Sequence, residues 1–184
     1  IEYWQAKQKR EKSFTPGKDF IPCAGAVFNE QEICAMVDTI LDGWFGLGKK
    51  GELFEKKLSE YVGMKHGILA NSGSSANLLA VTALMESNFK GGLKPGDEVI
   101  TSPNTFVASA NCAAYCGAEP VFADIDLNTY NISPEEIKNK INIHTKAIIP
   151  VHFAGQSCDM EAIRQIKKDG EKEEDKKIQE LGEE

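Results

Sequence analysis

Apolar side chains repeat with a helical period in the first third of the chain. The earliest stripe has the i, i+3, i+4, i+7, i+8 spacing of an amphipathic helix and consists of Ile33, Met36, Val37, Ile40 and Leu41. Asn29 followed by Glu32 predicts a capping box at the start of this helix, and Gly43 predicts its end. A glycine-rich loop over 43–51 then leads into a second predicted helix over 54–62.

From His66 onward, short apolar runs alternate with helical patterns. The runs of strand length are 66–70, 98–101, 120–123 and 147–151. The helices predicted between and after them are 74–85, 105–116, a helix that starts at Ser133-Pro134, and 159–168. Strands that alternate with helices predict an α/β fold, in which a mostly parallel sheet lies between two layers of helices.

Both ends of the chain differ from this pattern. Residues 1–22 show no sustained period and are interpreted as an extended arm. The segment after Lys168 consists mainly of charged residues and cannot bury an apolar face, which favours a disordered tail or a solvated helix. We therefore expect three parts: an arm, helix and glycine-rich loop over 1–50, an α/β domain over 51–168, and a charged tail over 169–184.

Composition excludes several classes of protein. The chain is 41% hydrophobic and 27% charged, with a formal net charge of -7, and its basic residues form no stripe, which argues against non-specific nucleic-acid binding. No apolar run approaches the length of about 20 residues that spans a bilayer, and the polar, basic start over 1–10 does not fit a signal peptide. The first residue is Ile1 and not Met, so we expect a fragment or a processed protein.

The five cysteines form no CxxC pair. Cys112 and Cys116 stand four residues apart on a predicted helix, where one face offers either two metal ligands or two small buried side chains. The buried interpretation is favoured, and no metal site is expected. An odd number of unpatterned cysteines suits the reducing cytoplasm.

Candidate chemistry lies where the predicted strands end, because open parallel sheets bind ligands outside the carboxyl ends of their strands. The first such segment, 71–76, is a hydroxyl-rich turn that enters a helix. Free backbone N–H groups at the positive end of the helix dipole, together with the hydroxyls of Ser74 and Ser75, suit a phosphate. The alternative is ordinary capping of the helix by Ser72 or Ser74, and the spacing leaves both open.

Two further segments lie at the same predicted edge. Phe106 stands in the helix that follows the second strand, where an aromatic side chain belongs either to the core or against a planar ring. His152 ends the fourth strand. It is interpreted either as a hydrogen-bonded structural histidine or as a group that contacts substrate or transfers a proton.

Three stretches of the chain, in order, resemble the sugar aminotransferases of the DegT/DnrJ/EryC1/StrS family. They read DGWFGLGKKGELFEKKLSEYVGMKHGILANSGSSANLLAVTAL, KPGDEVITSPNTFVASANCAAYCGAEPVFADIDLNTYNI and TKAIIPVHFAGQSCDMEAI. The resemblance covers about residues 20–166. The arm, the FEKKL stretch and the SSANLLA form of the serine turn are most similar to the branch that contains CDP-4-keto-6-deoxyglucose 3-dehydrase.

The resemblance implies part of the large domain of a pyridoxal-phosphate-dependent transferase, with the aspartate-aminotransferase fold and a homodimeric assembly. Ser74 and Ser75 match the turn that binds the cofactor phosphate, and Phe106 matches the aromatic side chain that stacks on the pyridine ring. Asn104 departs from the aromatic residue often found in its part of the loop. The residues that match loops near the sugar-nucleotide pocket or the active site are Trp44, Gly48, His152 and Gln156.

The implied activity is amination, or dehydration, of a nucleotide-linked ketosugar in the biosynthesis of cell-surface polysaccharides or deoxysugars, with an amino donor such as glutamate. In the family, the aspartate that pairs with the pyridine nitrogen, and the lysine or histidine of the catalytic centre, follow the region that this chain matches. We therefore expect a truncated N-terminal portion that holds no catalytic residue and is inactive alone. The alternatives are a non-catalytic interaction or dimerisation module, and an unrelated phosphate-binding α/β protein.

The resemblance also concerns the first strand. In the family, this strand pairs beside the last strand of the sheet, which has no counterpart here. Unpaired buried backbone groups cost about 1–3 kcal/mol each, so we expect an unstable chain or a rearranged segment over 66–70.

Overall fold

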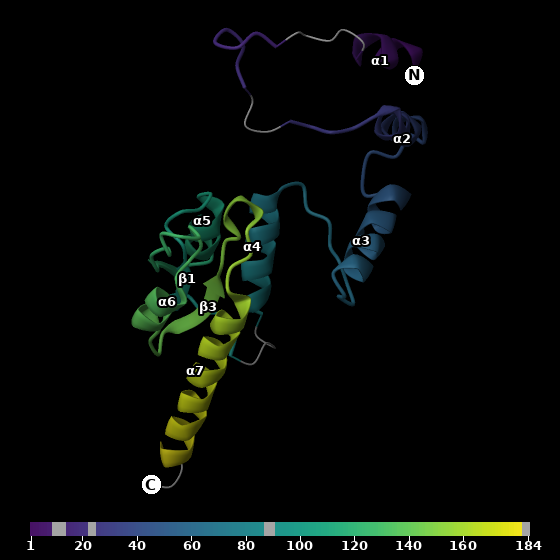
Figure 1. The fold of residues 1–184 in the computed structure, drawn as a ribbon. Helices are drawn as coiled ribbons and strands as arrows, with labels where there is room; N and C mark the ends of the chain where they lie inside the picture. The colour runs from purple at the N-terminus through teal and green to yellow at the C-terminus, as the bar shows by residue number, and fades with distance from the viewer. Residues whose placement is uncertain (9–13, 22–24, 87–90, 182–184) are drawn as a thin grey trace. The chain divides into compact units, whose positions relative to one another are not determined.

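The computed structural model describes residues 1–8, 14–21, 25–86 and 91–181 (Figure 1). The chain divides into two compact units, Ile1–Leu69 and Ala70–Glu184, and each is described by itself. Among the described residues, every strand lies in the second unit.

The regular elements of the first unit are α1 (Glu2–Gln8), α2 (Glu30–Leu41) and α3 (Lys49–Tyr61). The capping box predicted for α2 is confirmed, because Asn29 Oδ1 accepts the N–H of Gln31 at 2.7 Å and Glu32 Oε2 accepts the N–H of Asn29 at 2.8 Å. The extended arm predicted over 1–22 is wrong for its first residues, which form α1. Glutamine, alanine and lysine in that segment favour a helix even without an apolar stripe.

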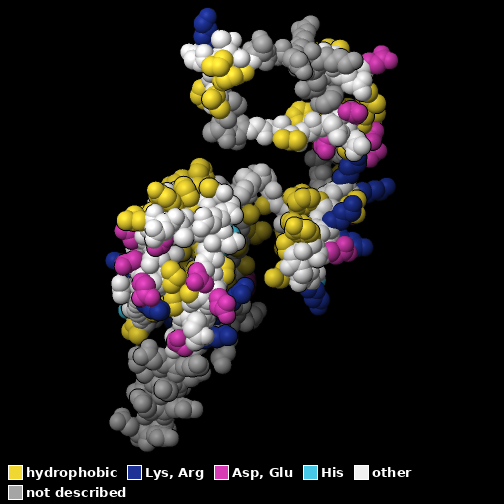
Figure 2. All heavy atoms as spheres, in the orientation of Figure 1, with side chains coloured by type: hydrophobic (Ala, Val, Ile, Leu, Met, Phe, Trp, Pro, Cys, Tyr) yellow, Lys and Arg dark blue, Asp and Glu magenta, His cyan; other side chains and the backbone are white. Residues whose placement is uncertain are grey.

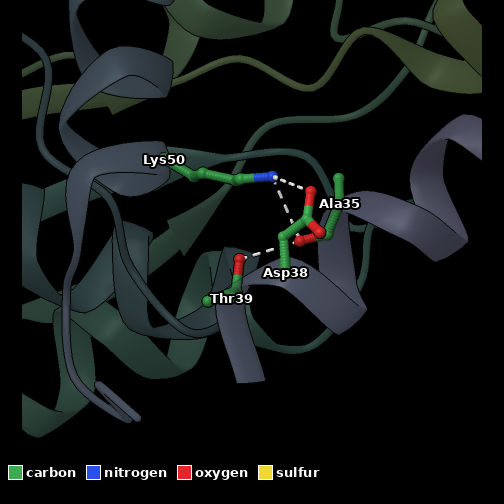
Figure 3. A network of polar contacts seen from close by, with 4 residues as sticks. All are labelled: Ala35, Asp38, Thr39 and Lys50. Atoms are coloured by element: carbon green, nitrogen blue, oxygen red, sulfur yellow. Dashed lines mark hydrogen bonds and ion pairs between the residues drawn. The ribbon is translucent and has the colours of Figure 1, made fainter. Parts of the chain in front are cut away.

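One lysine joins α2 to the start of α3, as Figure 3 shows. Lys50 Nζ donates to the carbonyl oxygen of Ala35 at 3.1 Å and lies 3.9 Å from a carboxylate oxygen of Asp38. Thr39 Oγ1 donates to the same carbonyl oxygen at 2.9 Å. An exposed ion pair of this kind contributes little stability. The contacts of Lys50 nevertheless connect the two helices that flank the glycine-rich loop.

The second unit contains a parallel sheet of β1 (Glu98–Thr101), β2 (Glu119–Phe122) and β3 (Thr145–Ile149). The strand order is β2-β1-β3, so β1 is central. Ile100 of β1 stands opposite Val121 of β2 and Ile148 of β3. The parallel sheet predicted from the last three apolar runs is therefore confirmed.

Four α-helices flank the sheet: α4 (Gly73–Leu84), α5 (Ala108–Tyr115), α6 (Pro134–Lys140) and α7 (Met160–Leu181). The predicted start of α6 is confirmed, since Ser133 Oγ accepts the N–H of Glu136 at 3.4 Å and Pro134 occupies the first helical turn. Proline is suited to that position because its missing N–H has no helical partner there.

Adjacent residues of β1 point to opposite faces of the sheet, and each face has its own core. The cluster that joins Val99 to α4 and α5 consists of Val81, Leu93, Val99, Cys112, Ala113 and Ala118. The cluster that joins Ile100 to α6 and α7 consists of Ile100, Ala123, Ile132, Ile137, Cys158, Ile163 and Ile166. Helices therefore cover both faces, and the predicted α/β architecture is confirmed (Figure 1).

The strand predicted over 66–70 is wrong. This segment has no regular structure, and the Ile68 side chain is 77% exposed. The backbone N–H of Leu69 donates to Glu55 Oε1 at 2.7 Å. A strand needs a neighbour for its backbone groups, and no strand of the described residues pairs with this segment. Of the two expected outcomes, an unstable chain or a rearranged segment over 66–70, the structure shows the second.

α7 continues through Leu181 and includes most of the segment expected as a charged tail over 169–184. The structure agrees with the helical alternative for this tail and differs from the disordered one. Glutamate, lysine and glutamine, which dominate the segment, are strong helix formers. No helix in the described part of the chain is both long and apolar enough to cross a membrane.

Candidate cofactor site

The carboxyl ends of β1, β2 and β3 meet at one edge of the sheet because the three strands are parallel. The segments that follow the strands at this edge are 102–107, 123–133 and 150–159. Ligand sites of open parallel sheets form outside such an edge. Phe106, His152 and Gln156 belong to the segments at this edge.

The helix with the serine turn ends at the opposite, amino edge of the sheet. α5 follows β1, so its C-terminal end lies at the amino edge. The segment between α4 and β1 lies beside that end, since Gly96 donates its N–H to the carbonyl oxygen of Gly117 at 2.8 Å. Near the C-terminal ends of the two helices, Thr82 Oγ1 lies 3.6 Å from Cys116 Sγ. α4 and α5 pack together. The Thr82–Cys116 contact joins their C-terminal parts, so we take the two helices to run in the same direction.

This arrangement points the serine turn toward the carboxyl edge. Ser74 precedes Thr82 by eight residues, and Ala108 precedes Cys116 by eight. Each helix rises about 12 Å over that length, so Ser74 and Ala108 reach a similar level. Phe106 comes two residues before Ala108. The N-terminal end of α4 and the Phe106 segment therefore lie on the same side of the sheet.

The serine turn is capped from within and is still open to an anion. The hydroxyl of Ser72 accepts the N–H of Ser75 at 3.2 Å, so capping by Ser72 is present. Gly73 and Ser74 precede the first N–H that finds a helical partner, and the Ser74 hydroxyl makes no hydrogen bond to any described residue. A Cβ atom added to Gly73 meets nothing within 4 Å, so no packed side chain fills the turn.

Phe106 belongs to neither core cluster, and its side chain is 72% exposed. Its backbone is fixed, because its carbonyl oxygen accepts the N–H of Ser109 at 3.0 Å at the entrance to α5. Thr105 Oγ1 also lies 2.8 Å from Ser109 Oγ. The core alternative for Phe106 is wrong, and an exposed ring on an ordered backbone is available for stacking.

His152 and Gln156 flank a short 3-10 helix, η1 (Phe153–Gly155). His152 Nδ1 accepts the backbone N–H of Cys158 at 3.1 Å, which is the hydrogen bond that the structural interpretation of His152 requires. In the neutral imidazole, that bond leaves the proton on Nε2 as a donor. The Gln156 side chain is exposed, and its backbone N–H donates to the Phe153 carbonyl oxygen at 3.0 Å.

Sequence reasoning missed Asn131, a buried polar residue whose carboxamide bonds to three backbone groups of this loop. It stands alone between Tyr130 and Ile132 in an irregular segment. No periodicity or motif indicates its burial there.

Trp44 and Gly48 belong to the first unit. Trp44 Nε1 donates to the carbonyl oxygen of Leu47 at 2.8 Å, which closes the glycine-rich loop on itself. A Cβ atom at Gly48 would stand 3.2 Å from Trp44 Cδ1, so the indole lies against this glycine. Figure 2 shows hydrophobic side chains on the visible surface of this unit as well as of the second unit.

The described residues contain no group of three or more His, Cys, Asp or Glu side chains able to hold a metal ion. Burial raises the pKa values of the Cys112 and Cys158 thiols. Thiols of this kind are poor nucleophiles and poor metal ligands at neutral pH. The buried interpretation of Cys112 is confirmed, and Cys116 beside it is half-buried.

Known proteins are similar to this chain in sequence. The model of the DegT/DnrJ/EryC1/StrS aminotransferase family matches residues 28–171. The spore coat polysaccharide biosynthesis protein SpsC of Bacillus subtilis (strain 168) is 45% identical over 144 residues, which are 78% of this chain and 35% of that protein. The lipopolysaccharide biosynthesis protein RfbH of Salmonella typhimurium is 41% identical over 156 residues, 84% of this chain and 36% of that protein. The chain spans about a third of the length of these curated relatives.

A solved structure shares the fold. The E. coli GDP-4-keto-6-deoxy-D-mannose-3-dehydratase with bound hydrated pyridoxal phosphate is similar with a TM-score of 0.74 and 30% identity, covering 79% of this chain and 37% of that one. The family match includes the serine turn, Phe106 and the His152 loop. The chain therefore belongs to the pyridoxal-phosphate-dependent DegT/DnrJ/EryC1/StrS aminotransferase family.

Proposed function

We propose that this chain supplies the phosphate-binding and ring-stacking part of the pyridoxal phosphate site in an enzyme that aminates or dehydrates a nucleotide-linked ketosugar. The observation that carries the proposal is the open serine turn. Ser74 offers a hydroxyl and an N–H at the positive end of α4, and a Cβ atom added to Gly73 would meet no described residue within 4 Å apart from its chain neighbours. A phosphate group fits such a helix start. The polysaccharide and lipopolysaccharide roles in the names of SpsC and RfbH support the sugar class.

When bound, pyridoxal phosphate supplies a ring that withdraws electrons from a substrate carbanion. The hydroxyls of Ser74 and Ser75 and the N–H groups at the start of α4 hold the phosphate in this proposal. Phe106 covers one face of the ring and excludes water from it. These residues fit the cofactor because the turn is unfilled and the Phe106 ring is exposed.

In the second unit, the substrate side of the site is assigned to the loop that follows β3. His152 presents Nε2–H as a donor to a substrate oxygen, since its Nδ1 already accepts a hydrogen bond. Gln156 offers an exposed carboxamide beside it. For Trp44 and Gly48, in the glycine-rich loop of the first unit, we propose separately a role in binding the sugar nucleotide, as the family resemblance implies.

The 184 residues alone are proposed to be inactive. A covalent link to the cofactor needs a lysine amine, and the segments 102–107, 123–133 and 150–159 contain no lysine. The chain by itself then holds pyridoxal phosphate without a covalent bond. The amino donor, the nucleotide sugar and a second copy of the subunit are partners of the complete enzyme, which we place in the cytoplasm.

Titration of the 184-residue chain with pyridoxal phosphate tests the proposal. We expect saturable binding that inorganic phosphate competes for and that pyridoxal without its phosphate does not reproduce. Ser74→Ala weakens the binding about tenfold, the effect of one hydrogen bond to a charged group. Thr82→Ala, which removes a hydroxyl from the other end of α4, is the control and leaves the affinity unchanged. A chain that binds no pyridoxal phosphate but co-purifies with a full-length homologue would support the interaction module instead.

A further inference from the structure

We propose that Asn131 is a positioning residue, whose buried carboxamide fixes the loop over 152–157 and thereby presents His152 as an Nε2–H donor. This inference rests on the proposed function, because it explains how His152 is prepared for that site.

Both donors of the Asn131 carboxamide, and its oxygen, bond to one loop. Its side chain is buried, with 4% relative exposure of the residue. Nδ2 donates to the carbonyl oxygens of Gln156 at 3.1 Å and Ser157 at 3.0 Å, and Oδ1 accepts the N–H of Phe153 at 2.9 Å. Only an amide of this orientation offers two donors and an acceptor together. The three bonds therefore clamp both ends of the loop to one side chain.

The loop held by Asn131 has a conformation that a free chain disfavours. Tyr130 and Ala154 have φ angles of 60° and 51°, and they are the non-glycine residues with positive φ in the described part of the chain. One precedes Asn131, and the other lies between its bonding partners. The rings of Tyr130 and Phe153 also lie near each other, with centroids 6.0 Å apart and planes tilted by 33°. Left-handed residues persist where surrounding contacts hold them, and the Asn131 bonds are such contacts.

The backbone around Asn131 is itself held by hydrogen bonds and by the core. Its carbonyl oxygen accepts the N–H of Asp126 at 2.9 Å. The Asp126 carboxylate accepts the backbone N–H groups of Thr129 and Asn128, which lower its pKa. The next residue, Ile132, is buried in the core cluster beneath β1. An anchor of this kind holds its partners in place, because it cannot move with them.

The fixed loop determines which nitrogen of His152 carries the proton. Ser157, held by Asn131, precedes Cys158, whose N–H donates to His152 Nδ1 at 3.1 Å. The Cys158 thiol donates to the Val151 carbonyl oxygen at 3.1 Å, so Cys158 contacts both the histidine and the residue before it. Loss of the clamp releases the Cys158 N–H from Nδ1, and the neutral imidazole then exchanges between its two tautomers.

Nitrogen-15 NMR of the histidine rings in the 184-residue chain tests this inference. In alkaline buffer we expect His152 with Nδ1 unprotonated and Nε2 protonated. In Asn131→Ala, the two ring signals move toward a shared averaged position, and exchange of the Phe153 amide hydrogen accelerates about tenfold for the lost hydrogen bond. Assignment uses His66→Gln and His144→Gln, since the chain has 3 histidines.

Asn142→Ala is the matched control. Asn142 lies at the amino edge of the sheet, where Nδ2 donates to Glu98 Oε2 at 2.7 Å and Oδ1 accepts the N–H of His144 at 2.8 Å. The Asn142→Ala substitution also removes a hydrogen-bonded carboxamide, and we expect it to leave the His152 signals in place. Unchanged His152 signals in a folded Asn131→Ala chain would overturn the proposal.

A measurement on the wild-type chain tests the inference even if Asn131→Ala does not fold. A scalar coupling across the hydrogen bond from the Cys158 N–H to His152 Nδ1 is expected, and a His152 ring protonated on Nδ1 would overturn the inference. Neither measurement uses cofactor or substrate. A failure here therefore leaves the pyridoxal phosphate titration intact, and a failed titration with the expected His152 tautomer rejects the proposed function alone.

Discussion

The backbone N–H of Ser75 donates to the hydroxyl of Ser72 at 3.2 Å, so the helix that begins the candidate site carries its own cap. The bond assigns helix capping to Ser72, whereas the sequence alone left open which serine of the turn caps the helix and which binds an anion. Ser72 stabilises the first turn of α4, while the hydroxyl of Ser74, two residues later, makes no hydrogen bond to a described residue. Substitutions of the two serines should therefore have different consequences.

Ser72→Ala is expected to lower the free energy of unfolding by about 1 kcal/mol, because the N–H of Ser75 loses its acceptor. Ser74→Ala is expected to leave the free energy of unfolding nearly unchanged and to weaken pyridoxal phosphate binding. Urea denaturation followed by circular dichroism measures the first effect. Ser72→Asn restores another favourable capping side chain and should recover stability. Equal losses of stability in the two alanine variants would contradict the separation of roles.

Acidification should weaken the start of α2. The backbone N–H of Asn29 lowers the pKa of the Glu32 carboxyl below its ordinary value. Because the pKa is lower in the folded chain than in the unfolded one, the carboxylate stabilises the fold above its unfolded pKa. That contribution is lost as the pH falls through the folded value. Titration of the Glu32 side-chain carbon by NMR, alongside circular dichroism, measures both changes.

Glu32→Gln tests the assignment of that effect. Glutamine also fits the third helical position of a capping box, so the helix should persist at neutral pH without the acid-dependent loss. Glu30→Gln removes a carboxylate from the same turn and should retain the acid response of the wild-type chain. A Glu32 carboxyl that titrates at its ordinary value would show that the capping box does not form in solution.

Local patterns predicted much of this fold because their causes are local. The capping box of Asn29 and Glu32 depends on residues three apart, and the Ser133-Pro134 start of α6 depends on adjacent ones. The apolar run over 66–70 is different, because a strand is stable only beside another strand. No local pattern shows whether that neighbour exists. The same limit explains the exposure of Ile68.

Among the residues of the candidate site, too, some could be predicted from local sequence and others could not. Ser74 and Phe106 could be named from their positions after predicted strands and from the family resemblance, and in the structure they stand next to the starts of α4 and α5. Asn131 could not, since its bonding partners stand 22 to 26 residues away in sequence. A lone asparagine in an irregular segment is usually exposed. Burial by a distant loop is visible only in three dimensions.

Ile100 and Ile68 provide a direct test of the core. Ile100 is fully buried at 0% exposure between β1 and the helices α6 and α7, so Ile100→Ala should cost about 2–5 kcal/mol of unfolding free energy. Ile68→Ala should change it by less than about 0.5 kcal/mol, the usual range for an exposed site. Urea denaturation of both variants measures the difference. Strong hydrogen-exchange protection over 68–70 in the monomeric chain would contradict the absence of a strand there.

Phe106 provides the test that joins the fold to the proposed cofactor. Phe106→Ala should weaken pyridoxal phosphate binding by about threefold to tenfold, the effect of losing an aromatic stacking partner. Stability should not change, because the ring lies outside both core clusters. Phe106→Tyr keeps a flat face and should retain affinity. Tyr115→Ala removes another exposed aromatic ring, at the opposite end of α5, and should have no effect.

The affinity for inorganic phosphate distinguishes stacking from a general disturbance of the site. Phosphate has no ring to stack, so Phe106→Ala should leave its binding at the serine turn unchanged, whereas Ser74→Ala should weaken the binding of both ligands. Competition titrations with the two ligands on the two variants measure all four affinities. A Phe106→Ala chain that loses phosphate binding as well would show that the side chain supports the turn itself. A variant that retains full pyridoxal phosphate affinity would remove Phe106 from the cofactor site.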